Sequence, residues 1–183
     1  MNTSSLKLPA YFTDNELALA EKYLKTANPN TSTLLEYGCG ASTLYFSKYV
    51  HKYYSIEHDY GWYSEISKEI LKQKIKNIQL FFIQSKCRPN LLENMDIPLF
   101  NKSLGTYIFE DYINFNTHLG MLDYVFIDGC ARKHCAFSVY NNLKPSSIVL
   151  FHDFNNREYY HDILQKYVSV ENADTLAILR RNQ

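Results

Sequence analysis

A glycine-rich turn is the first stretch of the chain whose residue types could do chemistry. It reads Glu36-Tyr37-Gly38-Cys39-Gly40-Ala41-Ser42-Thr43. Its first two residues are also the last two of Thr33–Tyr37, a segment that predicts a short strand. Two glycines let a backbone turn tightly and approach a ligand closely. Ser42 or Thr43 could then cap the helix that follows. The turn therefore suits a bound ligand, although a tight turn without a ligand would also explain the two glycines.

Two acidic residues near this turn restrict which ligands the turn could bind. A carboxylate at Glu36 would repel a pyrophosphate but would suit a ligand that carries an ammonium and a sulfonium. A dinucleotide fingerprint also requires a third glycine where Thr43 stands, which disfavours a nicotinamide oxidoreductase. Glu57 ends the next predicted strand, 19 residues after Gly38, about where an acid binds ribose hydroxyls in such folds. The residues favour a nucleoside-containing ligand other than a dinucleotide.

A second group of ionisable residues follows two later strands. Asp128 comes directly after the mainly apolar run Leu122–Ile127, and His152 and Asp153 follow Ile148–Phe151. If these strands are neighbours, their ends lie about 4.8 Å apart on the same edge of a sheet. A histidine or a carboxylate there could act as a general base, and a divalent ion held by the two aspartates could lower the pKa of a hydroxyl. The alternative for each acid is that it only caps the next helix.

The elements that position these residues alternate between strand and helix along almost the whole chain. The pattern Thr13-Asp14-Asn15-Glu16 reads as a capping box that starts a helix ending near Thr26. Apolar residues every four positions from Trp62 to Ile70 predict another amphipathic helix. The remaining expected elements are helices at 42–50, 107–115, 131–143 and 157–167, a turn at 145–147, and strands at 53–57, 78–83, 167–170 and 175–179.

This alternation predicts an α/β fold, a Rossmann-like parallel sheet with helices on both faces. The last two strands, joined by the short link 171–174, predict an antiparallel pair at the sheet edge. We expect one domain over residues 1–183, with an N-terminal helical segment at about 1–28. An irregular stretch at about 84–120 would be an insertion on the substrate side.

Composition excludes several classes of protein. The 183 residues carry 19 basic and 19 acidic side chains, so nothing in the overall charge suggests a nucleic-acid partner. No apolar run is long enough to span a membrane, and the N-terminus lacks the pattern of a secretory signal. The four cysteines form no C-x-x-C pair, which argues against a zinc site and predicts reduced thiols in the cytoplasm. The sequence gives no oligomeric state.

The first two motifs resemble those of class I S-adenosylmethionine-dependent methyltransferases. The resemblance rests on Glu36-x-Gly38-x-Gly40-x-Ser42 and on Tyr54-Ser55-Ile56-Glu57, and it extends over nearly the whole chain. It implies that the glycine turn holds the methionine end of S-adenosylmethionine and that Glu57 binds the ribose. The residues implied to contact this cofactor are Glu36, Gly38, Cys39, Gly40, Ser42, Thr43, Glu57, His58, Ser85 and Asp128.

Two further segments are similar to methyltransferases that modify glycans and other small molecules. They are Asp128-Gly129-Cys130-Ala131-Arg132 and His152-Asp153-Phe154-x-x-Arg157. The likeness implies that Asp128, His152 and Asp153 are catalytic, with Asp128 and Asp153 as candidate metal ligands. It implies that Arg132 and Arg157 bind the substrate. Metal-dependent relatives commonly have Asp or Asn where this chain has Phe154, so the metal remains an open question.

The sequence therefore predicts an O-methyltransferase that acts on a small hydroxylated acceptor, with a saccharide of a glycan pathway preferred. The preference for a saccharide rests on the family likeness rather than on physics. A phenolic or other small metabolite is the alternative acceptor. A domain that binds the cofactor without turnover is the alternative function. A nucleic-acid methyltransferase is disfavoured, because the chain lacks both a basic stripe and an Asn-Pro-Pro-aromatic tetrapeptide.

Overall fold

The alternating elements form a single mixed sheet, which confirms the predicted α/β Rossmann-like class. The computed structural model describes residues 12–86 and 108–182. In this part of the chain seven strands lie in the order β3-β2-β1-β4-β5-β7-β6. Neighbouring strands from β3 to β5 pair in parallel, and β7 pairs antiparallel with both β5 and β6. The strands are β1 (Thr33–Tyr37), β2 (Lys52–Glu57), β3 (Ile78–Phe82), β4 (Leu122–Ile127), β5 (Leu143–Phe151), β6 (Tyr167–Ala173) and β7 (Leu176–Arg181).

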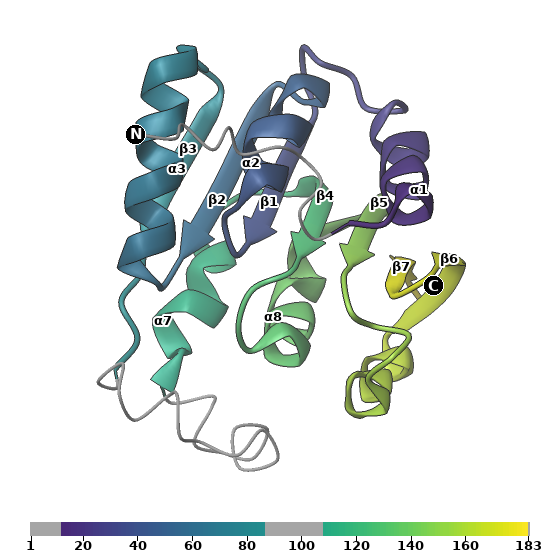
Figure 1. Ribbon diagram of the computed structural model, residues 1–183. Helices are drawn as coiled ribbons and strands as arrows, with labels where there is room; N and C mark the ends of the chain where they lie inside the picture. Colours follow the sequence, from purple (N-terminus) through teal and green to yellow (C-terminus); the bar gives the residue numbers. More distant parts are fainter. Residues whose placement is uncertain (1–11, 87–107, 183) are drawn as a thin grey trace.

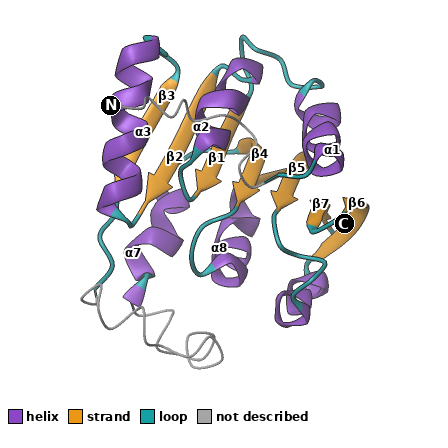
Figure 2. Ribbon diagram, in the orientation of Figure 1, coloured by secondary structure: helices purple, strands orange, loops and turns teal. Residues whose placement is uncertain are grey.

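Helices cover both faces of this sheet (Figures 1 and 2). Helices α1, α2 and α3 lie on one face, and α7 and α8 lie on the other. The described α-helices are α1 (Asp14–Leu24), α2 (Ala41–Phe46), α3 (Tyr60–Gln73), α7 (Glu110–Ile113) and α8 (Arg132–Val139). Short 3₁₀ helices follow at Ser47–Tyr49, Asn114–His118, Tyr140–Asn142 and Glu158–Gln165.

The central strands β1 and β4 are mostly apolar and supply side chains to two separate cores. On β1, Leu34 packs toward α1 and α2, whereas Leu35 packs toward α7 and α8. Phe126 and Ile127 divide in the same way on β4. Because successive side chains of a strand point to opposite faces, a strand covered on both sides needs apolar residues on both faces, and a polar residue there needs a partner. The apolar residues of Leu122–Ile127 are explained by this central place in the sheet, and Asp123 near the start of the strand accepts hydrogen bonds from Thr33 and Lys144.

The capping box of α1 ties the two ends of the described chain together. Thr13 Oγ1 accepts a hydrogen bond from the Glu16 N–H, and Glu16 Oε2 accepts one from the Thr13 N–H. The other oxygen of Glu16 accepts from the backbone N–H and the hydroxyl of Thr175, in the turn between β6 and β7. The predicted box is thus confirmed, and its buried acid also fixes the C-terminal strand pair that the sequence predicts at the sheet edge.

Several expected boundaries are wrong for identifiable reasons. The turn expected at 145–147 lies inside β5, where the pairing with β4 is interrupted between Leu122 and Tyr124. Pro145 has no N–H for a ladder, and Ser147 instead donates its hydroxyl to the Leu122 carbonyl. The helix expected at 157–167 is a 3₁₀ helix, and those expected at 42–50 and 131–143 end in 3₁₀ turns.

Two predicted segments extend beyond what the structure describes. Residues 1–11 of the expected N-terminal helical segment and residues 87–107 of the expected substrate-side insertion lie outside the described residues. Within the described ranges, no helix combines the length and the apolar character that crossing a membrane requires.

A carboxylate buried at the centre of the sheet holds the glycine turn in place. Glu36 on β1 has no exposed surface. It accepts hydrogen bonds from the hydroxyls of Ser42 (2.6 Å), Thr43 (2.5 Å) and Ser55 (2.7 Å). Burial raises the pKa of Glu36 to about 8, even though these three donors favour the ionised form. The first turn of α2 and the neighbouring strand β2 are thereby anchored to one acid.

This burial predicts how stability depends on pH. In the unfolded chain the Glu36 carboxyl titrates near 4.5, whereas in the folded protein its pKa is about 8. The proton bound only by the folded state therefore stabilises it at low pH, and this contribution is lost as the pH rises from about 5 to 8. For Glu36→Gln, denaturant unfolding should show that the free energy of unfolding of the variant rises relative to that of the wild type by up to about 4 kcal/mol across that range.

The exposed Glu65 on α3 provides the control. Glu65→Gln should leave the pH dependence of unfolding unchanged, because this side chain is exposed and lies away from the glycine turn. A constant difference between Glu36→Gln and the wild type from pH 5 to pH 8 would contradict the raised pKa.

Candidate active site

Strand register brings the predicted site residues to one edge of the sheet. Tyr37 is paired with Ile56 on one side and Ile127 on the other, and Ile127 is paired with Phe151. The residues that follow these four positions are Gly38, Glu57, Asp128 and His152, so they stand side by side where the arrowheads point in Figure 1. A cavity of about 650 Å³ opens at this edge. Its lining is Phe12, Gly38, Cys39, Gly40, Ala41, Ser42, Glu57, His58, Asp59, Trp62, Asp128, Gly129, Cys130, Arg132, His152 and Asp153.

The glycine turn crosses the loop after β4 at backbone contact. Gly38 has a φ of +94°, and a Cβ placed on it would lie 2.7 Å from the Cα of Gly129. A Cβ on Gly129 would in turn overlap the hydroxyl of Tyr112 on α7. Only glycine fits at either position, because any side chain would have to push the two loops apart.

Glu36 and Thr43, two of the residues expected to contact the cofactor, are fully buried beneath the glycine turn and do not line the cavity. The cap of α2 also differs from the expectation. Gly40 occupies the N-cap position, and its N–H donates to the Thr43 hydroxyl at 3.0 Å. Ser42 lines the cavity but turns its hydroxyl toward Glu36.

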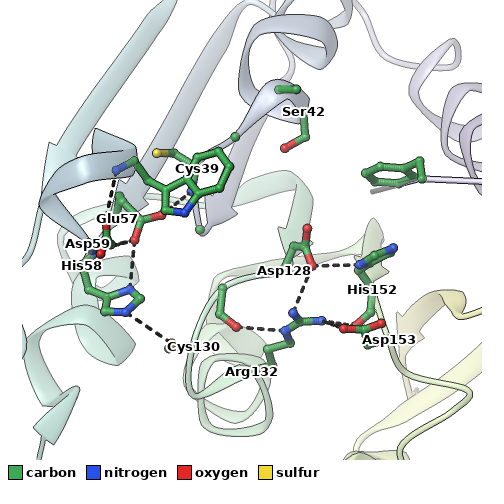
Figure 3. Close-up of a pocket in the computed structure, with 16 residues that line it drawn as sticks. Cys39, Ser42, Glu57, His58, Asp59, Asp128, Cys130, Arg132, His152 and Asp153 are labelled. Atoms are coloured by element: carbon green, nitrogen blue, oxygen red, sulfur yellow. Dashed lines mark hydrogen bonds and ion pairs between the residues drawn. The ribbon is translucent and has the colours of Figure 1, made fainter. Parts of the chain in front are cut away.

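Glu57, the last residue of β2, lines the cavity (Figure 3). Its Oε2 accepts the N–H of Cys39 at 2.8 Å, and its Oε1 accepts those of His58 and Asp59 at 2.7 and 2.8 Å. Burial alone would raise the pKa of Glu57, but its contacts with His58, Asp59 and Cys39 outweigh burial and lower it. An ionised acceptor therefore stands at the cavity where the sequence predicts it.

The imidazole of His58 lies between Glu57 and the loop after β4. Its Nδ1 is 2.9 Å from Glu57 Oε1, and its Nε2 is 3.4 Å from the sulfur of Cys130. Burial lowers the pKa of His58, but the contacts with Cys130 and Glu57 prevail and raise it to about 10. His58 was expected to contact the cofactor, and it does line the cavity.

At the other end of the cavity Arg132 joins two carboxylates (Figure 3). Its Nη2 is 3.1 Å from Asp128 Oδ1, and its Nη1 is 3.0 Å from Asp153 Oδ2. Further bonds from Arg132 to the carbonyls of Gly129 and His152 fix the guanidinium plane. Asp153 has a left-handed backbone, with a φ of +58°, which an aspartate tolerates better than most residues.

These contacts bear on the metal that the sequence leaves open. Asp128, His152 and Asp153 each offer a ligand atom, and the three atoms lie within 4.8 Å of one another. The guanidinium of Arg132 already bonds both carboxylates, however, so a positive charge is present where an ion would have to bind. The donor set as arranged here does not fit a divalent ion, because the ion would have to displace Arg132.

His152 is held between two acids. Its Nδ1 lies 2.9 Å from Asp128 Oδ1, and its Nε2 lies 3.6 Å from Oε2 of the buried Glu16. The ring of Phe12 stacks on the imidazole with centroids 4.9 Å apart. Burial lowers the pKa of His152, but Asp128, Asp153 and Glu16 together raise it. These surroundings favour the charged imidazolium over the neutral base that the sequence suggested.

Some expected residues lie away from the cavity, and others were missed. Ser85 is not among the lining residues, and Arg157 lies outside the lining as well, half-exposed and 2.8 Å from Asp153. Trp62, expected mainly to pack its helix, is 37% exposed and lines the cavity. Asp59 could have been found as the cap of α3, because its carboxylate accepts the Trp62 N–H. The other missed lining residues are Phe12, Ala41, Gly129 and Cys130.

Comparisons with known proteins identify the fold. No protein-family model and no curated protein matches the chain. Among solved structures, a methyltransferase-like protein from Silicibacter pomeroyi is similar at 18% identity and a TM-score of 0.65, over 92% of this chain and 86% of that one. An rRNA methylase from Streptococcus thermophilus is similar at 10% identity and a TM-score of 0.60, over 94% and 99%.

A third similar structure is a Streptococcus mutans protein solved in complex with SAH, at 9% identity and a TM-score of 0.59, over 93% of this chain and 100% of that one. Identities this low establish a common architecture. The chain has the Rossmann-like fold of the class I S-adenosylmethionine-dependent methyltransferases.

Proposed function

We propose that this chain is an S-adenosylmethionine-dependent methyltransferase that methylates a hydroxyl of a small acceptor, with a saccharide preferred. The observation that carries the proposal is the composition of a single cavity. One end holds the glycine turn and the ionised Glu57, and the other holds Asp128, Arg132 and His152. The common fold with methyltransferases, one of them solved with SAH, supports the same cofactor.

The residues at the first end fit this cofactor. Glu57 Oε2 receives a hydrogen bond from Cys39, and a carboxylate oxygen can accept more than one, so capacity remains for ribose hydroxyls. Gly38 and Gly40 allow the backbone to approach the methionine part closely. The exposed indole of Trp62 offers an aromatic face to a flat base. When bound, the cofactor supplies an activated methyl group on a sulfonium.

At the second end we assign to Asp128 the role of the base that receives the proton of the acceptor hydroxyl. Its contacts with His152 and Arg132 both use Oδ1, which leaves Oδ2 to accept the proton of an attacking hydroxyl. His152 and Arg132 orient this carboxylate, and Arg132 also balances its charge. The protein's role in the reaction is mainly to align the acceptor hydroxyl with the methyl carbon and to receive the proton of that hydroxyl.

Charge balance at this end supports an uncharged, polyhydroxylated acceptor. The carboxylates of Glu16, Asp128 and Asp153 are paired with Arg132, Arg157 and His152, whose raised pKa favours its charged form. Negative and positive groups in equal number leave little net field to select an anion or a cation. Carboxylates and guanidinium groups are also suitable partners for several hydroxyls at once. A phenol or another small metabolite remains the alternative acceptor, and binding without turnover the alternative function.

The function is tested by offering methyl-labelled S-adenosylmethionine with free sugars, nucleotide sugars, phenols and structured RNA. We expect label in a saccharide hydroxyl. RNA is included because two of the similar structures are described as rRNA methylases. Transfer to RNA alone would overturn the small-molecule assignment, and failure to bind SAH in calorimetry would overturn the cofactor.

Glu57→Gln tests the cofactor end. Replacing the carboxylate by an amide removes a charged acceptor for the ribose hydroxyls, so SAH affinity should fall by about 1–3 kcal/mol. Isothermal titration calorimetry measures the loss, and Glu65→Gln on α3 is the matched control. Because Glu57 also accepts three backbone N–H groups, the thermal midpoint is recorded for both variants. Unchanged affinity in folded Glu57→Gln would show that the carboxylate does not bind the cofactor.

Asp128→Asn tests the chemical end. Loss of a general base typically costs 10²–10⁴-fold in turnover, whereas SAH affinity should change far less. Because Arg132 supplies the positive charge here, EDTA should leave the rate of methyl transfer unchanged. Arg132→Met should lower turnover strongly. Inhibition by EDTA that Mg²⁺ or Mn²⁺ reverses would contradict the role given to Arg132.

A further inference from the structure

A cysteine, a histidine and a glutamate lie in close contact at the edge of the cavity, and the proposed methyl transfer gives a role only to the glutamate. The sulfur of Cys130 is 3.4 Å from His58 Nε2, and His58 Nδ1 is 2.9 Å from Glu57 Oε1 (Figure 3). The residues come from the ends of β2 and β4, and all three line the cavity. We call them the Cys130–His58–Glu57 group.

The order of these side chains suits activation of the thiol. Glu57 is ionised, so it favours the tautomer of His58 that carries its proton on Nδ1. Nε2 lies 3.4 Å from the sulfur of Cys130, and because the pKa of His58 is raised to about 10, it can receive the thiol proton and hold it as part of a charged imidazolium. A nucleophile, a base and a group that orients the base are the elements of an activated nucleophile in general.

The other described cysteines lack this arrangement. Burial raises the pKa of the Cys39 thiol, and the neighbouring carboxylates Glu57 and Glu36 raise it further. Cys135 is fully buried, and burial raises the pKa of its thiol as well. Cys130 is partly exposed and has an imidazole partner. The surroundings therefore distinguish one thiol from the other two.

We propose that Cys130 is a nucleophilic thiol and a modification site for small soft electrophiles that enter the cavity. In the reaction the sulfur forms a bond to the electrophilic carbon, the bond from that carbon to its leaving group breaks, and the thiol proton passes to His58 Nε2. With iodoacetamide the leaving group is iodide. The product is a thioether that projects into the cavity beside His58 and Glu57.

Such a modification would control the proposed cofactor site, a consequence that rests on the proposed function. Glu57, assigned to the ribose, contacts the same imidazole that activates Cys130. A group attached to the sulfur would occupy the space next to that carboxylate. Alkylated protein should therefore bind SAH more weakly than untreated protein.

The test is alkylation of the folded chain by iodoacetamide without any cofactor, followed by peptide mass spectrometry. A Cys87→Ser background is used, because Cys87 lies outside the described residues. We expect Cys130 to react at least about tenfold faster than Cys39 or Cys135. His58→Gln should slow Cys130 by about tenfold, and His51→Ala, at an exposed histidine, should leave its rate unchanged.

The direction of the His58→Gln effect separates loss of a base from loosening of the fold. A loosened structure would expose all three thiols and raise their rates together, whereas loss of the base lowers the rate of Cys130 alone. Equal rates for Cys130 and Cys39, or a Cys130 rate that His58→Gln leaves unchanged or raises, would overturn the proposal. Because no cofactor is present, this result is independent of whether SAH binds.

Discussion

The contact between Gly38 and Gly129 is the constraint on which the rest of the site depends. Neither loop can retreat, because the Gly38 N–H is bonded to the Ile56 carbonyl and the Asp128 N–H to the Tyr37 carbonyl. The crossing therefore fixes the distance between the end of the sheet that carries Glu57 and the end that carries Asp128. It also brings Cys130 within reach of His58. A methyl group at either glycine would disturb both ends of the cavity at once.

The elements that local pattern specifies could be predicted well. Apolar runs gave the parallel strands, and the ends of those strands gave Gly38, Glu57, Asp128 and His152, because parallel strands share one carboxyl edge. The capping box at Thr13 was equally readable, since its partners lie three residues apart. Helices with weaker signals were misjudged near their ends, where 3₁₀ turns replace the last α-helical turn.

Partnerships between distant residues could not be predicted. Glu36 lies one residue before the end of β1 and Glu57 ends β2, yet hydroxyl groups surround the first carboxylate while the second faces the cavity. Only packing decides between these environments. Arg132 appeared as a substrate-binding residue, and its bonds to two carboxylates needed the loops after β4 and β5 to meet. Glu16 lies close to His152, 136 positions away in the sequence, so an acid that reads locally as a cap also contributes to the raised pKa of a cavity residue. Contacts of this kind join charged residues that are far apart in the sequence, so no periodic sequence pattern predicts them.

Glu36 adds a consequence for ligand binding. Its pKa of about 8 leaves the carboxyl largely protonated at neutral pH, directly beneath the turn that would receive a positively charged ligand. A cation bound above it favours the ionised form, so ligand binding and proton release are linked. The released proton is taken up by the buffer. The heat of binding near neutral pH should therefore include the protonation enthalpy of the buffer, and the apparent affinity should rise toward alkaline pH.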